Sequence, residues 1–316
     1  DENAVEVGFA GLYDTVLSYM ASQLFKSANN KLQQTAHKYA NKVLHLAAAE
    51  EHRKDFPLHN IKASKSKGGE EYYLPGVHSD VGGSYNKADE GKIKKETDPA
   101  KKEALLVFRN KEELTINQGQ LWEMEADKQW LDTQGWYKGK KDNRTVSMIK
   151  SDAKATIKEL EKKRKFKLEL RDGDFTINLY FHPRQSNSYD PSVYFAYATL
   201  SVSRVDIHSA FSSIPLKVMA DYVKNEPKLM IKKELEDRAN SVIDVSNLGD
   251  LEKKVLGYIG KKPANSKAED WIGEGEELNN FLKNYRNKHL NFSASKGPGY
   301  APKIEDGKRT RFIYDA

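Results

Sequence analysis

The stretch EYYLPGVHSDVGGSY, residues 71–85, begins as an apolar, β-prone segment and ends in a glycine-rich turn that carries His78. A second stretch of the same kind, VEVGFAGLYDTV at residues 5–16, ends on the carboxylate of Asp14. Both patterns predict a strand that runs into a loop. Between them the pattern predicts a helix, a short strand and a second helix, at residues 15–40, 42–46 and 47–56. This alternation is typical of an α/β fold with a mainly parallel sheet.

The chain changes character after residue 85. Residues 105–137 are rich in tryptophan and leucine and predict helices on a second core, and residues 150–164 predict a solvated helix. A β-hairpin is indicated around the turn Asp172-Gly173, because apolar residues alternate with polar ones on both sides. A serine and an early proline predict a helix start at 212–215, and residues 289–316 predict strands. We therefore expect a core segment (1–85), a region of helical and β-hairpin insertions (86–288) and C-terminal strands that return to the core (289–316).

The composition is typical of a soluble globular protein with a small excess of basic residues. Among 316 residues, 38% are hydrophobic and 31% are charged, with 52 basic and 46 acidic side chains and a net charge of +6. An anionic partner such as a phospholipid surface fits this balance, whereas nucleic-acid binding is disfavoured because lysines are scattered among nearly as many acids. The chain has no cysteine, which excludes disulfides, thiolate metal sites and a cysteine nucleophile.

The first residues do not have the pattern of a cleavable signal peptide, since they lack a basic start and a clean apolar core. The sequence contains no run of 18 apolar residues, so no transmembrane helix is expected. The apolar segment at residues 5–12 is interpreted as a buried central strand. A chain that begins on such a strand suggests that further sequence precedes it.

Asp14 and His78 are the candidate catalytic residues. A carboxylate at the end of one strand can fix the tautomer of an imidazole at the end of another and stabilise its protonated form. Glycines around His78 allow a tight turn without blocking the approach of a substrate. The alternative is that Asp14 caps a helix and His78 is an ordinary loop histidine, and the chemistry of the residues alone does not separate the two.

The strings GLYDTV, HLAAAEEHRKDF and YLPGVHSDVGGSY resemble the α/β-hydrolase family that includes the class-one lipase effectors of the bacterial type VI secretion system. The resemblance is dense over residues 7–85 and fainter elsewhere, where it includes HLNFS at 289–293 and the closing GKRTRFIYDA. It implies an α/β-hydrolase fold, with Asp14 as the orienting acid and His78 as the general base of a Ser-Asp-His triad.

The nucleophile departs from the family pattern. That pattern has a Gly-x-Ser-x-Gly-like elbow before the acid strand, and no such elbow occurs in the sequence. Ser79 and Ser84 lie beside the histidine, but neither lies between a strand and a helix. Three explanations remain open: a serine on a separate, cleaved polypeptide, a serine in a preceding segment, or an inactive relative.

Asp80, Gly82 and Gly83 are expected to support the histidine loop. Asp80 either holds the glycine turn by accepting backbone N–H bonds, which we favour, or orients His78 itself. Glu51 and Arg53 are interpreted as a structural ion pair, with a surface helix as the alternative. The remaining histidines show no spacing typical of metal ligands, so neither a metal nor a cofactor is expected.

The leading hypothesis is a serine esterase that hydrolyses phospholipid acyl esters, and the resemblance extends it to an antibacterial secreted effector. The expected partners are a membrane surface, a fragment or chain that carries the nucleophile, and an immunity or secretion carrier protein. The resemblance implies delivery to the periplasm or membrane of a target cell. The alternative is a non-catalytic, α/β-hydrolase-like binding module or secretion adaptor.

Overall fold

A computed structural model of the chain describes residues 7–16, 39–84, 107–109, 129–136, 167–172, 175–183, 194–202, 207–225, 232–262, 265–293, 303–305 and 308–315. The chain divides into two compact units, one formed by residues 1–97 together with 206–316 and the other by residues 98–205. The expected helices at 15–40 and 150–164 lie almost entirely outside the described residues. The same holds for most of the expected helical region 105–137.

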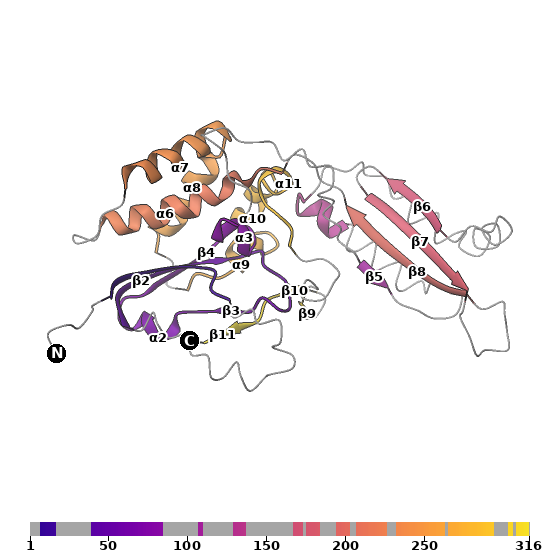
Figure 1. Ribbon diagram of the computed structural model, residues 1–316, viewed down its shortest axis with the longest axis horizontal. Helices are drawn as coiled ribbons and strands as arrows, with labels where there is room; N and C mark the ends of the chain where they lie inside the picture. Colours follow the sequence, from indigo (N-terminus) through magenta and orange to yellow (C-terminus); the bar gives the residue numbers. More distant parts are fainter. Residues whose placement is uncertain are drawn as a thin grey trace. The chain divides into compact units, whose positions relative to one another are not determined.

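A three-stranded parallel sheet forms the centre of the first unit (Figure 1). It consists of β1 (Val7–Tyr13), β2 (Ala40–Ala48) and β4 (Glu70–Leu74), in the order β1-β2-β4. Tyr13 pairs with Leu46 across the first interface, and the last residues of β2 and β4 pair with each other. The carboxyl ends of all three strands therefore meet at one edge, and the α/β class expected from the sequence is confirmed.

The middle strand, β2, supplies most of the buried apolar surface of this sheet. Leu44, Leu46 and Ala47 are fully buried, as is usual for a parallel strand that is covered on both faces. β2 extends through Ala48, so the helix expected at residues 47–56 is wrong: the alanines pair with Tyr73 and Leu74 of β4 instead. β1 lies at one edge of the described sheet and its side chains are exposed or half-buried, whereas a buried central strand was expected.

Helices between residues 206 and 289 cover the sheet of the first unit. The longest are α6 (Ser213–Lys224), α7 (Lys233–Val245) and α8 (Gly249–Gly260), which lie together above the sheet in Figure 1. They are followed by the short helices α9 (Glu269–Ile272), α10 (Glu277–Leu282) and α11 (Arg286–His289), and η2 (Ser209–Ser212) precedes them. The helix start expected at 212–215 is confirmed by α6.

Residues 206–288, which the sequence analysis grouped with the insertion, thus belong to the same unit as the sheet. The rings of Phe9 in β1 and Tyr222 in α6 are 5.9 Å apart. Trp271 of α9 donates from its indole to the carbonyl of Tyr73 in β4 at 2.7 Å. These contacts join residues about 200 positions apart, and no local sequence pattern marks them.

The described part of this unit also contains two short helices and two short strand pairs. The helices are α2 (Lys62–Lys65) and α3 (His78–Gly82). β3 (Leu58–His59) pairs in parallel with β11 (Ile313–Tyr314), and β9 (Lys303–Glu305) pairs with β10 (Lys308–Thr310). Strands near the C-terminus were expected, but residues 290–293 have no regular structure.

The second unit contains a four-stranded antiparallel sheet in the order β5-β8-β7-β6. Its strands are β5 (Val107–Arg109), β6 (Lys167–Asp172), β7 (Phe175–Pro183) and β8 (Tyr194–Val202). β6 and β7 pair in antiparallel fashion, and the pair beside the turn is Asp172 with Phe175. This pairing confirms the expected hairpin. β5 occupies residues for which the sequence analysis expected helix.

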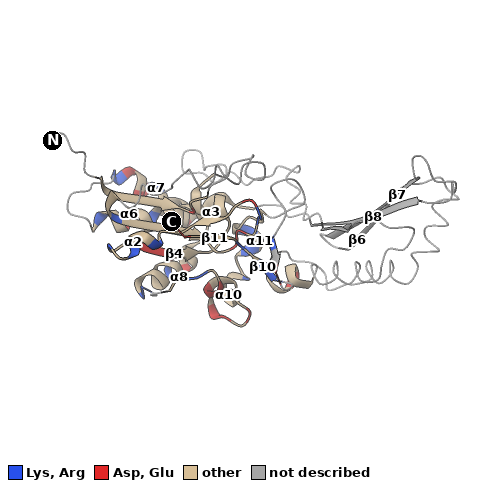
Figure 2. Cartoon of the chain, turned by 90° about the horizontal axis from the view of Figure 1, so that it is seen from below, with Lys and Arg blue, Asp and Glu red and all other residues tan. Residues whose placement is uncertain are grey.

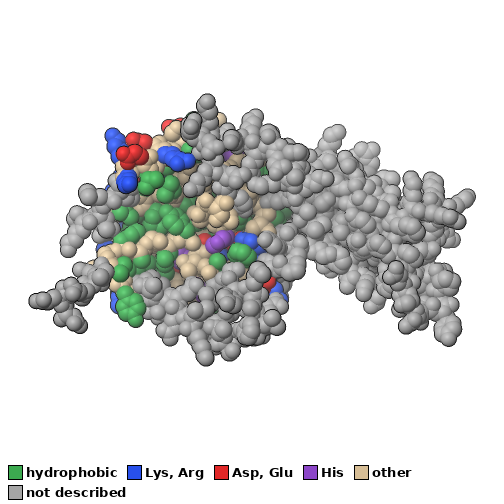
Figure 3. Space-filling model, in the orientation of Figure 1, with side chains coloured by type: hydrophobic (Ala, Val, Ile, Leu, Met, Phe, Trp, Pro, Cys, Tyr) green, Lys and Arg blue, Asp and Glu red, His purple; other side chains and the backbone are tan. Residues whose placement is uncertain are grey.

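Charges of both signs are mixed over the first unit. Figure 2 shows both Lys or Arg positions and Asp or Glu positions on the described part of the first unit. Exposed ion pairs such as Lys62–Asp315 and Lys253–Asp250 follow the same pattern. On the face shown in Figure 3, hydrophobic side chains spread over the described part of the unit, and histidine atoms reach the surface among them.

Candidate active site

Asp14 is the first residue after β1, and its backbone is held in the left-handed region at φ 42°. Its N–H donates to the carbonyl of Leu46 at 2.7 Å, and its Oδ1 accepts from the N–H of Ala48 at 2.7 Å. Aspartate tolerates this conformation better than most residues, although it still stores strain. The turn aims a fully buried carboxylate across the carboxyl end of β2.

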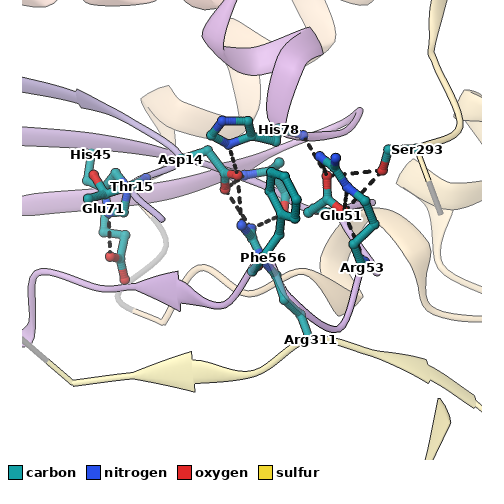
Figure 4. Close-up of polar contacts among 11 residues, drawn as sticks. Asp14, Thr15, His45, Glu51, Arg53, Phe56, Glu71, His78, Ser293 and Arg311 are labelled. Atoms are coloured by element: carbon teal, nitrogen blue, oxygen red, sulfur yellow. Dashed lines mark hydrogen bonds and ion pairs between the residues drawn. The ribbon is translucent and has the colours of Figure 1, made fainter. Parts of the chain in front are cut away.

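His78 is the first residue of the short helix α3, which begins four residues after β4. Its Nδ1 lies 2.9 Å from Oδ2 of Asp14 (Figure 4). The structure thus brings the two predicted residues together at one edge of the sheet, although 64 positions separate them. The imidazole is 26% exposed, and within the described part of the chain its Nε2 has no hydrogen-bond partner.

The charge of Asp14 decides the direction of this hydrogen bond. Burial alone would raise the pKa of Asp14, but the charge of Arg311 and hydrogen bonds from His78, Arg311 and Ala48 outweigh it and hold the pKa well below its ordinary value. An ionised carboxylate only accepts hydrogen bonds. Nδ1 of His78 therefore carries the proton, and Nε2 has the free lone pair that a general base needs.

Arg311 is a residue of this site that the sequence analysis did not predict. Its Nη1 donates to Oδ1 of Asp14 at 2.6 Å and its Nη2 donates to Oδ2 at 2.8 Å, across 297 positions. The string GKRTRFIYDA was noticed only as a family-like C-terminal strand. Nothing in its local pattern indicates a partner at the other end of the chain.

Three successive backbone N–H groups of the histidine loop each donate to a different buried carboxylate. The distances are 2.9 Å, 3.0 Å and 3.3 Å, for Gly76 to Glu50, Val77 to Asp80 and His78 to Glu51. Each N–H bond to a charged acceptor is stronger than one between neutral groups. The loop that carries His78 is therefore held at three consecutive residues.

Each of these carboxylates has at least one further partner from residues 286–293. The partners are Arg286 for Glu50, the backbone and side-chain amides of Asn291 for Asp80, and Arg53 with Ser293 for Glu51. The Glu51–Arg53 ion pair expected from the sequence is present and buried. The partners in 286–293 come from the segment that carries the HLNFS string.

Of the two roles considered for Asp80, its contacts match the one in which it holds the glycine turn. Its Oδ2 accepts from Val77 and Asn291 and its Oδ1 accepts from the Asn291 amide, whereas the imidazole of His78 bonds to Asp14. Burial raises the pKa of Asp80 to about 7, although these hydrogen bonds oppose the rise. Gly83 ends α3 at φ 76°, with its N–H bonded to Ser79, and a Cβ on Gly82 would meet no atom within 4 Å.

A second histidine–carboxylate pair lies on the other side of the Asp14 turn (Figure 4). Nδ1 of His45 is 2.9 Å from Oε2 of Glu71, and Nε2 of His45 accepts from the N–H of Thr15 at 3.1 Å. The ring is fully buried and both of its nitrogens are used. His45 therefore supports the turn that carries Asp14 and has no free nitrogen for catalysis.

The residues that the structure describes contain no cluster of three His, Cys, Asp or Glu side chains that could hold a metal ion. No serine hydroxyl of the described segments hydrogen-bonds to His78, and this includes Ser79 inside α3 and Ser84 shortly after it. None of the described helices is both long enough and apolar enough to cross a bilayer.

Comparison with known proteins gives a family match and a similar solved structure. Residues 1–105, which contain Asp14 and His78, match the model of the family described as "T6SS, Phospholipase effector Tle1-like, catalytic domain". The solved structure is described as "Structure of the Tle1 effector bound to the VgrG spike from the Type 6 secretion system"; it is 18% identical, with a TM-score of 0.43. The alignment covers 98% of this chain and 57% of that one. No curated protein matches the chain.

The family match falls on the segment whose motifs carried the resemblance, and it includes both residues of the acid–histidine pair. Residues 1–105 are therefore similar to the catalytic domain of the Tle1-like phospholipase effectors of type VI secretion systems, which confirms the family resemblance inferred from the sequence.

Proposed function

We propose that the chain is part of a serine esterase that hydrolyses phospholipid acyl esters, with Asp14 as the orienting acid and His78 as the general base. The observation that carries the proposal is the 2.9 Å hydrogen bond between them at the carboxyl edge of a parallel sheet. The unpartnered Nε2 within the described residues and the 26% exposure of the His78 side chain support its role as the base. The family match of residues 1–105 supports the phospholipid substrate.

In the proposed reaction, Nε2 of His78 takes the proton of a serine hydroxyl while the serine oxygen attacks the ester carbonyl carbon. Backbone N–H groups stabilise the negative oxygen of the tetrahedral intermediate. The imidazolium then gives its proton to the departing lysophospholipid oxygen, which leaves an acyl-serine. Water, deprotonated by the same nitrogen, attacks the acyl-serine and releases the fatty acid and the serine.

The serine itself is proposed to lie outside residues 1–316, since the sequence contains no Gly-x-Ser-x-Gly-like elbow. The role of this chain is then to hold the base. Asp14 keeps the Nδ1–H tautomer and stabilises the imidazolium, and the three carboxylates around the histidine loop fix its position. Asp80, Gly82 and Gly83 act as supporting residues.

The finer architecture is proposed on the same basis. The strand order β1-β2-β4 and the position of the pair suit the acid and histidine half of an α/β-hydrolase fold. We propose that residues 1–85 and the C-terminal strands form the catalytic core, and that residues 98–205 are an insertion that docks on the membrane.

The family match supports a proposal for the biological setting. We propose an antibacterial effector that is delivered to the periplasm or membrane of a target cell. A secretion carrier is the expected partner, because the structural neighbour is described as bound to a VgrG spike. An immunity protein in the producing cell is a further expected partner.

The direct test is fatty-acid release from phospholipid vesicles by the full-length protein and by its His78→Ala variant. We expect a loss of about 10³-fold or more, since removal of a triad base leaves only the oxyanion and binding contributions. The matched control is His59→Ala, which removes an imidazole from β3 that makes no hydrogen bond to Asp14 in the described residues. Equal release by wild type and His78→Ala would remove His78 from the mechanism.

A fluorophosphonate probe followed by peptide mapping tests where the serine lies. A labelled serine outside residues 1–316 supports the proposal, and a labelled serine within them contradicts it. If the full-length protein neither releases fatty acid nor takes up the probe, the non-catalytic binding module replaces the esterase.

A further inference from the structure

The carboxylate of Asp14 receives two hydrogen bonds on each oxygen. Oδ1 accepts from the N–H of Ala48 and from Nη1 of Arg311, while Oδ2 accepts from His78 and from Nη2 of Arg311. The guanidinium is thus the one group that bonds both oxygens. A paired, two-point contact of this kind fixes the plane of a carboxylate, which a single N–H bond does not.

The same guanidinium is tied to the strand ends that surround the site. Its Nε donates to the carbonyl of Phe56 at 2.8 Å, and its Nη1 lies 3.3 Å from the carbonyl of Ala48. The side chain of Arg311 is 7% exposed and that of Asp14 is fully buried. The cation is therefore buried against the carboxylate.

Anchoring of the C-terminal segment does not by itself require Arg311. Backbone bonds join Leu58 to Phe312 at 2.8 Å and Asn60 to Tyr314 at 3.0 Å, on either side of the β3–β11 pair. Asp315 adds contacts to Lys62 and to the side chain of Asn60. None of these contacts uses the side chain of residue 311. Anchoring of the segment therefore does not account for the bonds between the guanidinium and Asp14.

We propose that Arg311 is a positioning residue for the proposed catalytic acid: its two-point contact keeps Asp14 ionised and turns Oδ2 toward Nδ1 of His78. The inference rests on the proposed function of the pair. Arg311 is not a catalytic residue, because both of its terminal nitrogens bond to Asp14 and none of its contacts faces the exposed side of the imidazole.

Lysine and arginine differ in a way that tests this inference. A lysine at position 311 supplies a charge but no planar group that can donate two parallel hydrogen bonds, and a methionine supplies neither. We expect Arg311→Met to lower kcat by about 10²-fold, the size of effect that a misplaced catalytic group produces, with KM changed less than about threefold. Arg311→Lys is expected to lower kcat by about tenfold, again with little change in KM.

The proton shared by His78 and Asp14 gives a readout that does not depend on catalysis. In the proton NMR spectrum of the full-length protein we expect a low-field resonance for this proton, which Asp14→Asn abolishes and thereby assigns. Arg311→Met and Arg311→Lys should displace or broaden it. Asp315→Asn is the matched control: it removes a charged contact of the same segment and should leave both kcat and the resonance unchanged.

Each outcome of these experiments supports or overturns the inference on Arg311. A loss of kcat and a displaced resonance in Arg311→Lys, with Asp315→Asn unchanged, supports the inference. Wild-type kcat and an unmoved resonance in Arg311→Lys overturn it, even if Arg311→Met fails to fold. If His78→Ala keeps full activity, the proposed function has failed, and the resonance alone then decides whether Arg311 orients the carboxylate.

Discussion

Arg286 donates from Nε to Oε1 of Glu50 at 2.5 Å, although 236 positions separate the two residues. The side chains are 1% and 2% exposed. The other oxygen of Glu50 accepts from the N–H of Gly76, two residues before His78. A cation in α11 thus holds a carboxylate at the end of β2, and that carboxylate holds the histidine loop.

Removal of one member of this pair should be costly. Arg286→Met leaves the charge of Glu50 buried without its partner, for which we expect a loss of about 3–5 kcal/mol in the free energy of unfolding. Urea titration measures the loss. The double variant Glu50→Gln, Arg286→Met should recover part of it, because no unpaired charge remains. A loss below about 1 kcal/mol in the single variant would contradict the buried pairing.

The burial of Asp80 should make stability depend on pH. Its pKa is raised from 3.8 to about 7 in the folded state, so the folded protein binds this proton more tightly than the unfolded chain. The contribution of Asp80 to stability is then fully present below about pH 4 and is lost as the pH rises through about 7. Asp80→Asn keeps the shape and has no charge to bury.

We therefore expect the difference in unfolding free energy, variant minus wild type, to rise by about 2–4 kcal/mol between pH 4 and pH 8. The amide of Asn291 can turn to accept from the new side chain, which keeps the hydrogen bonds satisfied. Urea titrations of both proteins at several pH values give the difference directly. A difference that stays constant over this range would show that Asp80 does not titrate as inferred.

Gly76 has two reasons to be glycine. Its φ is +91°, and a Cβ there would lie 2.7 Å from Cβ of Asp80. Gly76→Ala should cost about 2–5 kcal/mol, since left-handed strain and overlap with a buried side chain add. Gly68→Ala is the matched control: φ is +87°, but nothing lies within 4 Å, so only the strain of about 1–2 kcal/mol remains.

Denaturant unfolding of the two alanine variants measures this contrast, and vesicle hydrolysis shows whether only Gly76→Ala disturbs the histidine. Equal losses of stability would mean that the contact with Asp80 is unimportant.

The two histidine–carboxylate pairs should differ in their effect on activity. Nε2 of His45 accepts from Thr15, so His45 has no nitrogen with which to take a proton. His45→Gln is expected to keep activity within about tenfold of wild type and to lose about 1–3 kcal/mol of stability, because it disturbs a buried hydrogen-bond network. His78→Gln should lose about 10³-fold or more in kcat and little stability. Rates measured well below the unfolding temperature compare the two, and a reversed order would assign the base to His45.

The sequence allowed Asp14 and His78 to be predicted because each follows a short apolar strand. Loops at the carboxyl ends of parallel strands meet at one edge, so two local patterns predict one contact. The hairpin at Asp172 and the start of α6 were predictable for a similar reason, since turn and cap residues act on their immediate neighbours.

The failures share a physical cause. An alanine-rich run after residue 46 suits a helix, but its pairing with β4 makes it strand, and helix propensity is a weak preference beside such burial. Arg311, Arg286 and Asn291 stabilise carboxylates more than 200 positions away. Charge pairing over such a span leaves no periodic trace in the local sequence, so these residues needed coordinates.

The similarity to the catalytic-domain family ends at residue 105, but the cations that neutralise Asp14 and Glu50 belong to residues 286–311. An excised fragment with only the first 105 residues would retain the acid and the histidine and would bury two carboxylates without counter-ions. Residues 1–105 are consequently not an independent module that can be transferred to another scaffold. A truncated version of the protein must include the C-terminal arginines.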